Sequence, residues 1–136
     1  MPGLKSRKIG DDTERRVWYD LLSKGFIASK WHNNVDLEKN MICIAKPGRF
    51  KRTTTGFPDF IYFKIEDKIE REIIGLEVKT NGGLSKIEKQ KCEWYLKNNV
   101  FSKIQIASRI KEKGRIKIVY SDDVNERRCE NEQKRK

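Results

Sequence analysis

Apolar residues along this chain fall into short segments whose spacing predicts either a helix or a strand, and polar turns separate the segments. Two segments have helical spacing, residues 11–24 and residues 85–98. The other segments are short and rich in β-branched or aromatic residues, which predicts strands; these are residues 26–32, 41–46, 59–64, 72–79, 101–108 and 115–120. This order of helices and strands predicts a mixed β-sheet flanked by helices, an α/β fold.

The first predicted helix has an apolar stripe on one side, formed by Val17, Trp18, Leu21 and Leu22. Three residues are candidates for its N-terminal cap, namely Asp11, Asp12 or Thr13. Gly25 stands where a glycine commonly ends a helix. Extending the stripe back by three positions from Val17 reaches Glu14, so we expect the Glu14 carboxylate to point toward the body of the protein.

The second predicted helix opens at Ser85, and Glu88 follows at the spacing of a capping box. Its buried side is predicted to consist of Ile87, Trp94 and Tyr95. Residues 1–10 are expected to be loose and residues 33–40 to form a turn. Residues 1–120 are predicted to form a single domain, followed by a charged, disordered tail over residues 121–136.

Two short motifs bring acidic and basic groups onto neighbouring predicted strands. Gly56-Phe57-Pro58-Asp59 opens one strand, and Gly75-Leu76-Glu77-Val78-Lys79 ends the next. Because side chains alternate along a strand, Glu77 and Lys79 share one face, while Ile74, Leu76 and Val78 take the other. Two carboxylates and a lysine that converge in this way are suited to divalent-metal hydrolysis.

These motifs resemble those of the PD-(D/E)XK nuclease superfamily, and more closely its VRR-NUC branch and the related archaeal Holliday junction resolvases. The resemblance rests on Gly56 before Pro-Asp, on Glu-Val-Lys, on the segment 80–85 after it, and on Glu14 in an acidic first helix. It covers roughly residues 11–109. It implies a restriction-endonuclease-like core for this chain.

The resemblance also implies roles for individual residues. Asp59, Glu77 and the backbone carbonyl of Val78 would hold Mg²⁺, for which Mn²⁺ is expected to substitute, and Lys79 would orient the attacking water. Glu14 would complete the metal shell. The chain departs from the VRR-NUC pattern of Ser, two residues and Gln, because Glu88 stands at the glutamine position and Gln90 follows two residues later. Both are accessory candidates.

Each of these residues also has a purely structural interpretation. Asp59 would be a turn aspartate after proline, and Glu77 would face water on an edge strand. Lys79 would be a solvated strand lysine, and Glu14 would be favoured by the helix macrodipole alone. For Asp59, Glu77 and Lys79 the motif context favours the catalytic interpretation.

The chain has 136 residues, of which 38% are charged, and 31 Lys and Arg outnumber 20 Asp and Glu to give a net charge of +11. Such an excess favours a polyanionic partner, although solubility alone is the alternative. Six basic residues are candidates for contact with the DNA backbone: Lys46, Arg49, Lys51, Arg52, Lys86 and Lys89. The odd number of cysteines and the single histidine make a structural zinc site unfavourable.

Together these features predict a Mg²⁺-dependent, structure-specific endodeoxyribonuclease that acts on branched DNA, with a Holliday junction resolvase as the leading interpretation. A homodimer is expected, since two sites would then face one junction. The alternatives are a nicking, flap or repair nuclease of viral replication, an RNA-processing enzyme, or a non-catalytic DNA-binding protein. The sequence contains no apolar run of membrane length, so an intracellular, cytoplasmic protein is expected, in the host cell if the source is viral.

Overall fold

The computed structural model describes residues 2–45, 56–80 and 83–122, and this part of the chain forms two helices and seven strands. The helices are α1 (Pro2–Ser23) and α2 (Lys86–Lys97). The strands are β1 (Phe26–Lys30), β2 (Asn33–Asp36), β3 (Met41–Ile44), β4 (Phe60–Lys64), β5 (Ile74–Val78), β6 (Lys103–Glu112) and β7 (Arg115–Ser121).

Five of the strands form one mixed sheet in the order β1-β4-β5-β6-β7, and β2 pairs with β3 in a separate hairpin. Within the sheet β5 and β6 run parallel, and the other neighbouring strands run antiparallel. A parallel pair needs a crossover connection, which α2 provides between β5 and β6. The predicted mixed α/β architecture is therefore confirmed.

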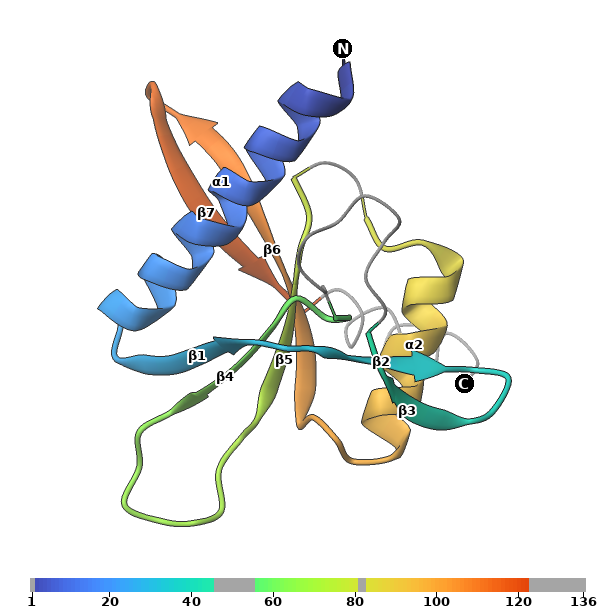
Figure 1. Ribbon diagram of the computed structural model, residues 1–136. Helices are drawn as coiled ribbons and strands as arrows, with labels where there is room; N and C mark the ends of the chain where they lie inside the picture. The colour runs from blue at the N-terminus through green and yellow to red at the C-terminus, as the bar shows by residue number, and fades with distance from the viewer. Residues whose placement is uncertain (1, 46–55, 81–82, 123–136) are drawn as a thin grey trace, which may run out of the picture.

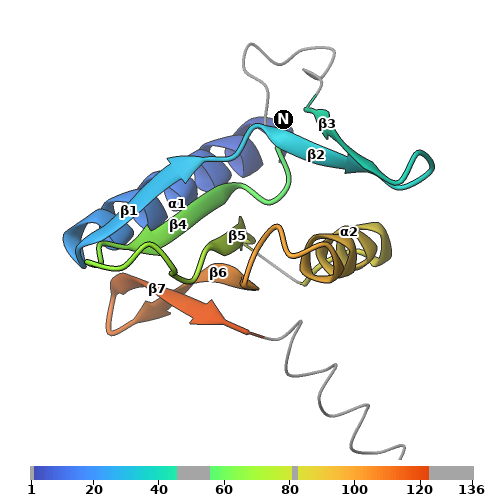
Figure 2. The same cartoon turned by 90° about the horizontal axis from the view of Figure 1, so that it is seen from below.

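The two helices cover different parts of the sheet (Figures 1 and 2). Helix α1 crosses the strands and contacts β1, β5, β6 and β7. Helix α2 lies beside the β2–β3 hairpin, away from α1. Each helix has its own core. One contains Val17, Leu21, Phe60, Tyr62, Ile74, Leu76 and Ala107; the other contains Val35, Phe57, Leu84, Cys92, Tyr95, Phe101, Ile104 and Ile106. Consecutive residues Ile106 and Ala107 belong to different cores, so the cores lie on opposite faces of the sheet.

Helix α1 is longer than the sequence pattern predicts. It begins at Pro2, where proline is favoured in the first turn, so the expectation of a loose segment over residues 1–10 is wrong for residues 2–10. Thr13 is no cap either, because its hydroxyl donates to the Ile9 carbonyl at 2.7 Å from inside the helix. At the other end Gly25 has a φ of +87°, which confirms the predicted glycine termination.

The predicted apolar stripe of α1 is only half correct. Val17 and Leu21 are buried in the core, whereas Trp18 and Leu22 are 37% and 49% exposed. Only Val17 and Leu21 are fully enclosed, while Trp18 packs edge-on against Phe60 and keeps part of its ring in solvent. The side chains of Trp18 and Leu22 therefore lie partly in solvent, beside the buried row of α1.

Two further local predictions are decided by the structure. Residues 33–36 form strand β2 instead of a turn, because Val35 is buried in the core beneath α2. The capping box of α2 is confirmed, with Ser85 Oγ accepting from the Glu88 N–H and Glu88 accepting from the Ser85 N–H. On the buried side of that helix Tyr95 is fully buried and Trp94 partly buried, as predicted, but Ile87 is exposed, and Cys92 is buried in the core.

Among the described residues no helix is both long and apolar enough to cross a membrane. Cys92 is buried and Cys43 is half-buried. The predicted C-terminal tail falls almost entirely on residues 123–136, which lie outside the described part of the chain, as does Cys129.

Candidate active site

Strand pairing brings the two predicted acidic ligands together. In the antiparallel pair β4–β5, Phe60 lies opposite Leu76, which places Asp59 next to Glu77 at the end of the pair. Phe60 and Leu76 are buried beneath α1, so Asp59 and Glu77 point to the other face of the sheet. The predicted alternation along β5 is confirmed, because Ile74, Leu76 and Val78 all pack toward α1.

Glu77 is a buried carboxylate in an unfavourable environment. It is 6% exposed, and its Oε1 atom has no hydrogen-bond partner among the described residues. Burial raises the pKa of Glu77 well above its ordinary value, and the charge of Asp59 and a hydrogen bond with it raise this pKa further. Two carboxylates in such contact are stable together only when a proton or a cation lies between them.

Asp59 is fixed to the neighbouring strand by its own side chain. Its Oδ2 atom accepts a hydrogen bond from the Val78 N–H at 2.8 Å. The Asp59 carbonyl accepts from the Trp31 N–H at 3.0 Å, which ties the same residue to the end of β1. Asp59 is therefore held between two strands, and its carboxylate cannot turn away from Glu77 without breaking the bond to Val78.

Lys79 joins this pair from the end of β5. Its Nζ atom lies 3.5 Å from Glu77 Oε2 and 2.8 Å from Glu88 Oε2. Burial lowers the pKa of Lys79, but the hydrogen bond and charge of Glu88 and the charge of Glu77 raise it more, so that the net shift is upward. Lys79 is thus an ammonium ion at neutral pH, able to donate hydrogen bonds and to offset negative charge, but not to act as a base.

Glu88 has two functions in the structure. It closes the capping box of α2 and also pairs with Lys79. Burial raises the pKa of Glu88, but the hydrogen bonds from Lys79 and from the Ser85 N–H lower it, to a net value of about 2. Glu88 is therefore ionised throughout the physiological range.

Glu14 is inward-pointing, as predicted, but it is engaged by a residue that the sequence analysis did not single out. Its Oε2 atom accepts from Lys30 Nζ at 2.7 Å. Burial raises the pKa of Glu14, the hydrogen bond from Lys30 opposes this, and the charge of Asp59 adds to the rise. The negative charge of Asp59 therefore makes ionisation of Glu14 less favourable, while the positive charge of Lys30 makes it more favourable.

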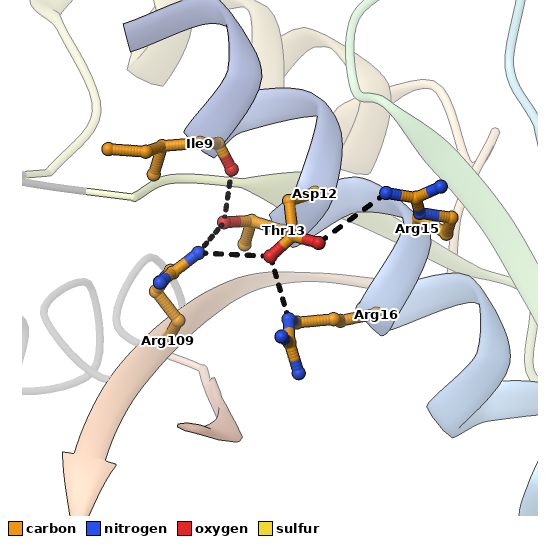
Figure 3. A network of polar contacts seen from close by, with 6 residues as sticks. All are labelled: Ile9, Asp12, Thr13, Arg15, Arg16 and Arg109. Carbon is orange, nitrogen blue, oxygen red and sulfur yellow. Dashed lines mark hydrogen bonds and ion pairs between the residues drawn. The ribbon is translucent and has the colours of Figure 1, made fainter. Parts of the chain in front are cut away.

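A polar network fastens α1 to the sheet and thereby sets the position of Glu14 (Figure 3). Arg109 on β6 donates to Asp12 at 3.3 Å and to Thr13 at 3.4 Å. Arg15 and Arg16 on the helix itself pair with the same Asp12 carboxylate. Because Glu14 follows Thr13 directly, this network orients the helix turn from which Glu14 reaches Lys30.

The Gly56–Asp59 segment is held from two sides. The Tyr95 hydroxyl on α2 donates to the Phe57 carbonyl at 2.6 Å and accepts from Trp31 Nε1 at 3.2 Å. The Gly56 N–H donates to the Trp31 carbonyl at 3.1 Å. Tyr95 and Trp31 are thus supports of Asp59 that no motif revealed, because their roles depend on contacts between residues far apart in the chain.

The remaining predicted residues lie farther from this cluster or outside the described structure. Gln90 is exposed on α2, and Glu88, not Gln90, contacts Lys79. Lys86 and Lys89 are exposed on the same helix. The four basic residues of the preceding loop, Lys46, Arg49, Lys51 and Arg52, lie outside the described residues.

The neighbouring carboxylates of Asp59 and Glu77 provide negatively charged oxygen ligands, which suit a divalent cation. No three side chains of the His, Cys, Asp and Glu types gather as an ion-binding group within the described ranges. A cation would therefore be held by these two carboxylates together with backbone or water oxygens, which is an ordinary arrangement for Mg²⁺. The unpartnered, buried Oε1 of Glu77 is the atom that such a cation would satisfy.

Comparison with models of protein families, with curated protein sequences and with solved structures finds no match for this chain. Function is therefore inferred from the geometry of the site. Paired carboxylates beside an ammonium ion can bind a divalent cation and a phosphate together. The carboxylates bind the cation, and the cation and the ammonium ion both attract the phosphate.

Proposed function

We propose that this protein is a Mg²⁺-dependent endodeoxyribonuclease with a restriction-endonuclease-like core of the PD-(D/E)XK type. One observation carries the proposal above all: in the buried carboxylate of Glu77, Oε1 has no hydrogen-bond partner among the described residues, and Oε2 lies 3.5 Å from the Lys79 ammonium group. A carboxylate with only a structural role would be expected to have its oxygens satisfied by protein donors. An oxygen kept free in this position favours a ligand that is bound during function.

Hydrolysis of a phosphodiester adds water across a P–O bond. A new bond forms between phosphorus and the water oxygen, the bond to the 3′ oxygen breaks, and the proton passes to the leaving oxygen, which gives a 5′-phosphate and a 3′-hydroxyl. Asp59, Glu77 and the Val78 carbonyl would hold the cation, which supplies Lewis-acid stabilisation of the charged phosphate when bound. Lys79 offers a fixed positive charge and hydrogen-bond donors, which suit orientation of the water and stabilisation of phosphate charge.

DNA is the proposed substrate, and branched DNA with a Holliday junction is the leading candidate. The net charge of +11 favours a polyanion. The exposed Lys86 and Lys89 extend positive charge along α2 from the candidate site. A symmetric homodimer would provide two sites for paired cuts across a junction.

Cleavage of a defined panel of nucleic acids tests this function. The full chain should cut a four-way junction faster than flap, linear duplex or single-stranded DNA with Mg²⁺ or Mn²⁺, and should cut none of them with EDTA. An RNA duplex of the same sequence should remain intact. Binding of all DNA forms without any cleavage would contradict the enzyme and favour a non-catalytic binding protein. A preference for flaps, nicks or RNA would replace the junction assignment.

Glu88→Gln should separate the catalytic contact of this residue from its structural one. Glutamine keeps the capping box, so the fold should change in stability by less than about 1 kcal/mol. The variant removes the charge that raises the pKa of Lys79, so this pKa should fall. In the wild type the Lys79 pKa is raised above 10.5, so cleavage that depends on its ammonium group should hold up to pH 10, whereas a rate profile of Glu88→Gln from pH 6 to pH 10 should decline at the alkaline end.

Glu93→Gln is the matched control, because Glu93 is exposed on the same helix and its removal changes the net charge equally. The control profile should superimpose on that of the wild type. A Glu88→Gln profile without an alkaline decline would show that Glu88 only caps the helix.

A further inference from the structure

A groove with exposed aromatic and aliphatic walls runs along α1 on the face of the sheet opposite Glu77. Its volume is about 490 Å³, within the range of small-ligand sites, roughly 300–1,000 Å³. Trp18, Tyr19 and Leu22 form the helix side, and Lys30 and Phe60 come from β1 and β4. Helix α1 lies behind β1 and β4 in Figure 2 and runs at an angle to β1 in Figure 1.

The walls of the groove are held in place by contacts with the body of the protein. The Trp18 ring packs edge-on against Phe60, with 5.5 Å between centroids, and its Nε1 donates to the Ala28 carbonyl at 3.1 Å. Lys30 Nζ lies 4.8 Å from the centre of the Phe60 ring. Tyr19, in contrast, is 67% exposed, so its ring is available to a partner.

The groove is directly connected to the candidate active site. Glu14 lines the groove and is held by Lys30 at its rim, and it lies near enough to Asp59 for the charge of that carboxylate to raise the Glu14 pKa. Asp59 and Glu77 lie at the end of the β4–β5 pair, so a DNA strand with a phosphate there can pass round this end and bring a neighbouring nucleotide to the groove on the other face. We propose that the groove receives an unpaired base of the DNA substrate, which stacks on Tyr19; this inference rests on the proposed nuclease function.

The charges at the rim favour a base over other occupants. Asp11 and Glu14 offset Arg15 and Lys30, so the groove as a whole has no excess positive charge with which to bind a phosphate. A neutral base with polar edges and an apolar face matches both the rim and the aromatic wall. A second copy of the chain fits less well, because a dimer interface seated here would have to desolvate four charged side chains.

Tyr19→Ala tests the inference in EDTA, where binding is measured without cleavage. The probes are two fluorescent DNA duplexes of equal length, one fully paired and one with a three-base unpaired bubble. Loss of stacking should weaken binding of the bubble roughly tenfold and leave binding of the paired duplex within about twofold. Tyr19→Phe keeps the ring and should bind like the wild type, and Ile69→Ala, at an exposed residue of the β4–β5 loop, should also do so.

Each alternative outcome is distinct. Equal binding of the bubble by wild type and Tyr19→Ala, or equal loss on both probes, overturns the base-binding groove but leaves the nuclease proposal intact. A change of oligomeric state in Tyr19→Ala, seen by sedimentation, overturns it in favour of a contact between copies. If the wild type binds neither probe, the base-binding groove is overturned, and the cleavage panel decides the nuclease separately. If the bubble-specific loss is found but the cleavage panel is negative, the groove stands and the enzyme does not.

Discussion

Glu77→Gln should abolish DNA cleavage, by roughly a thousandfold or more, while making the metal-free fold more stable. The loss of activity follows because an amide cannot replace a carboxylate as a ligand for a divalent cation, a contribution worth several kcal/mol. The gain in stability follows because a buried amide costs less than a buried carboxylate that faces Asp59. We expect an increase of about 1–2 kcal/mol in the free energy of unfolding near pH 7.5.

The pH dependence of stability gives the same substitution a second readout. The pKa of Glu77 is raised in the folded state from an ordinary value of 4.5. At a pH between 4.5 and the raised pKa of the folded state, Glu77 keeps a proton in the native protein that it has released in the unfolded chain. The free energy of unfolding therefore falls as the pH rises through this interval. Urea denaturation across pH 4–9 should show this decline in the wild type and a flatter profile in Glu77→Gln. Mg²⁺ should reduce the decline in the wild type alone.

Glu72→Gln provides the matched control for both readouts. Glu72 lies just before β5, is exposed, and only approaches Lys103 at 3.9 Å. Its removal should leave cleavage and the pH profile nearly unchanged. Near-normal cleavage by Glu77→Gln would refute the assignment of Glu77 as a metal ligand.

Gly56→Ala should be the most destabilising single-methyl substitution in the candidate site. A Cβ atom at Gly56 would lie 2.2 Å from the Trp31 carbonyl oxygen, 2.5 Å from the Asn33 carbonyl oxygen and 2.9 Å from the Asn33 nitrogen. All three are backbone atoms that cannot rotate away, so the chain itself must shift. The shift would strain the bonds from Gly56 to Trp31 and from Phe57 to Asn33. We expect a loss of about 3 kcal/mol or more in the free energy of unfolding.

Denaturation of Gly56→Ala beside Gly83→Ala measures this effect, because no atom lies within 4 Å of a Cβ built at Gly83. The control should change by less than about 0.5 kcal/mol. Cleavage should also fall in Gly56→Ala at temperatures where it remains folded, since Asp59 follows the displaced segment. Stability close to that of the wild type would mean that β1 and β2 can separate from Gly56 at little cost.

The sequence alone located the main elements and the faces of the central strands. Alternation along a strand is a local property, so the common face of Glu77 and Lys79 followed from their spacing. The capping box at Ser85 and Glu88 is equally local and was predicted correctly. The start of α1 was predicted wrongly. Residues 2–10 have only weak helix signals, and the possible caps at residues 11–13 placed the start of the helix too late.

Only the tertiary structure decided which partner each charged group takes. Glu14 pairs with Lys30, Glu88 holds Lys79, and Tyr95 supports Phe57. The raised pKa of Glu77 likewise depends on how deeply β5 is buried and on how close Asp59 comes. These properties arise from contacts across the sheet between residues that are distant in the chain, and spacing along a sequence carries no information about such distances.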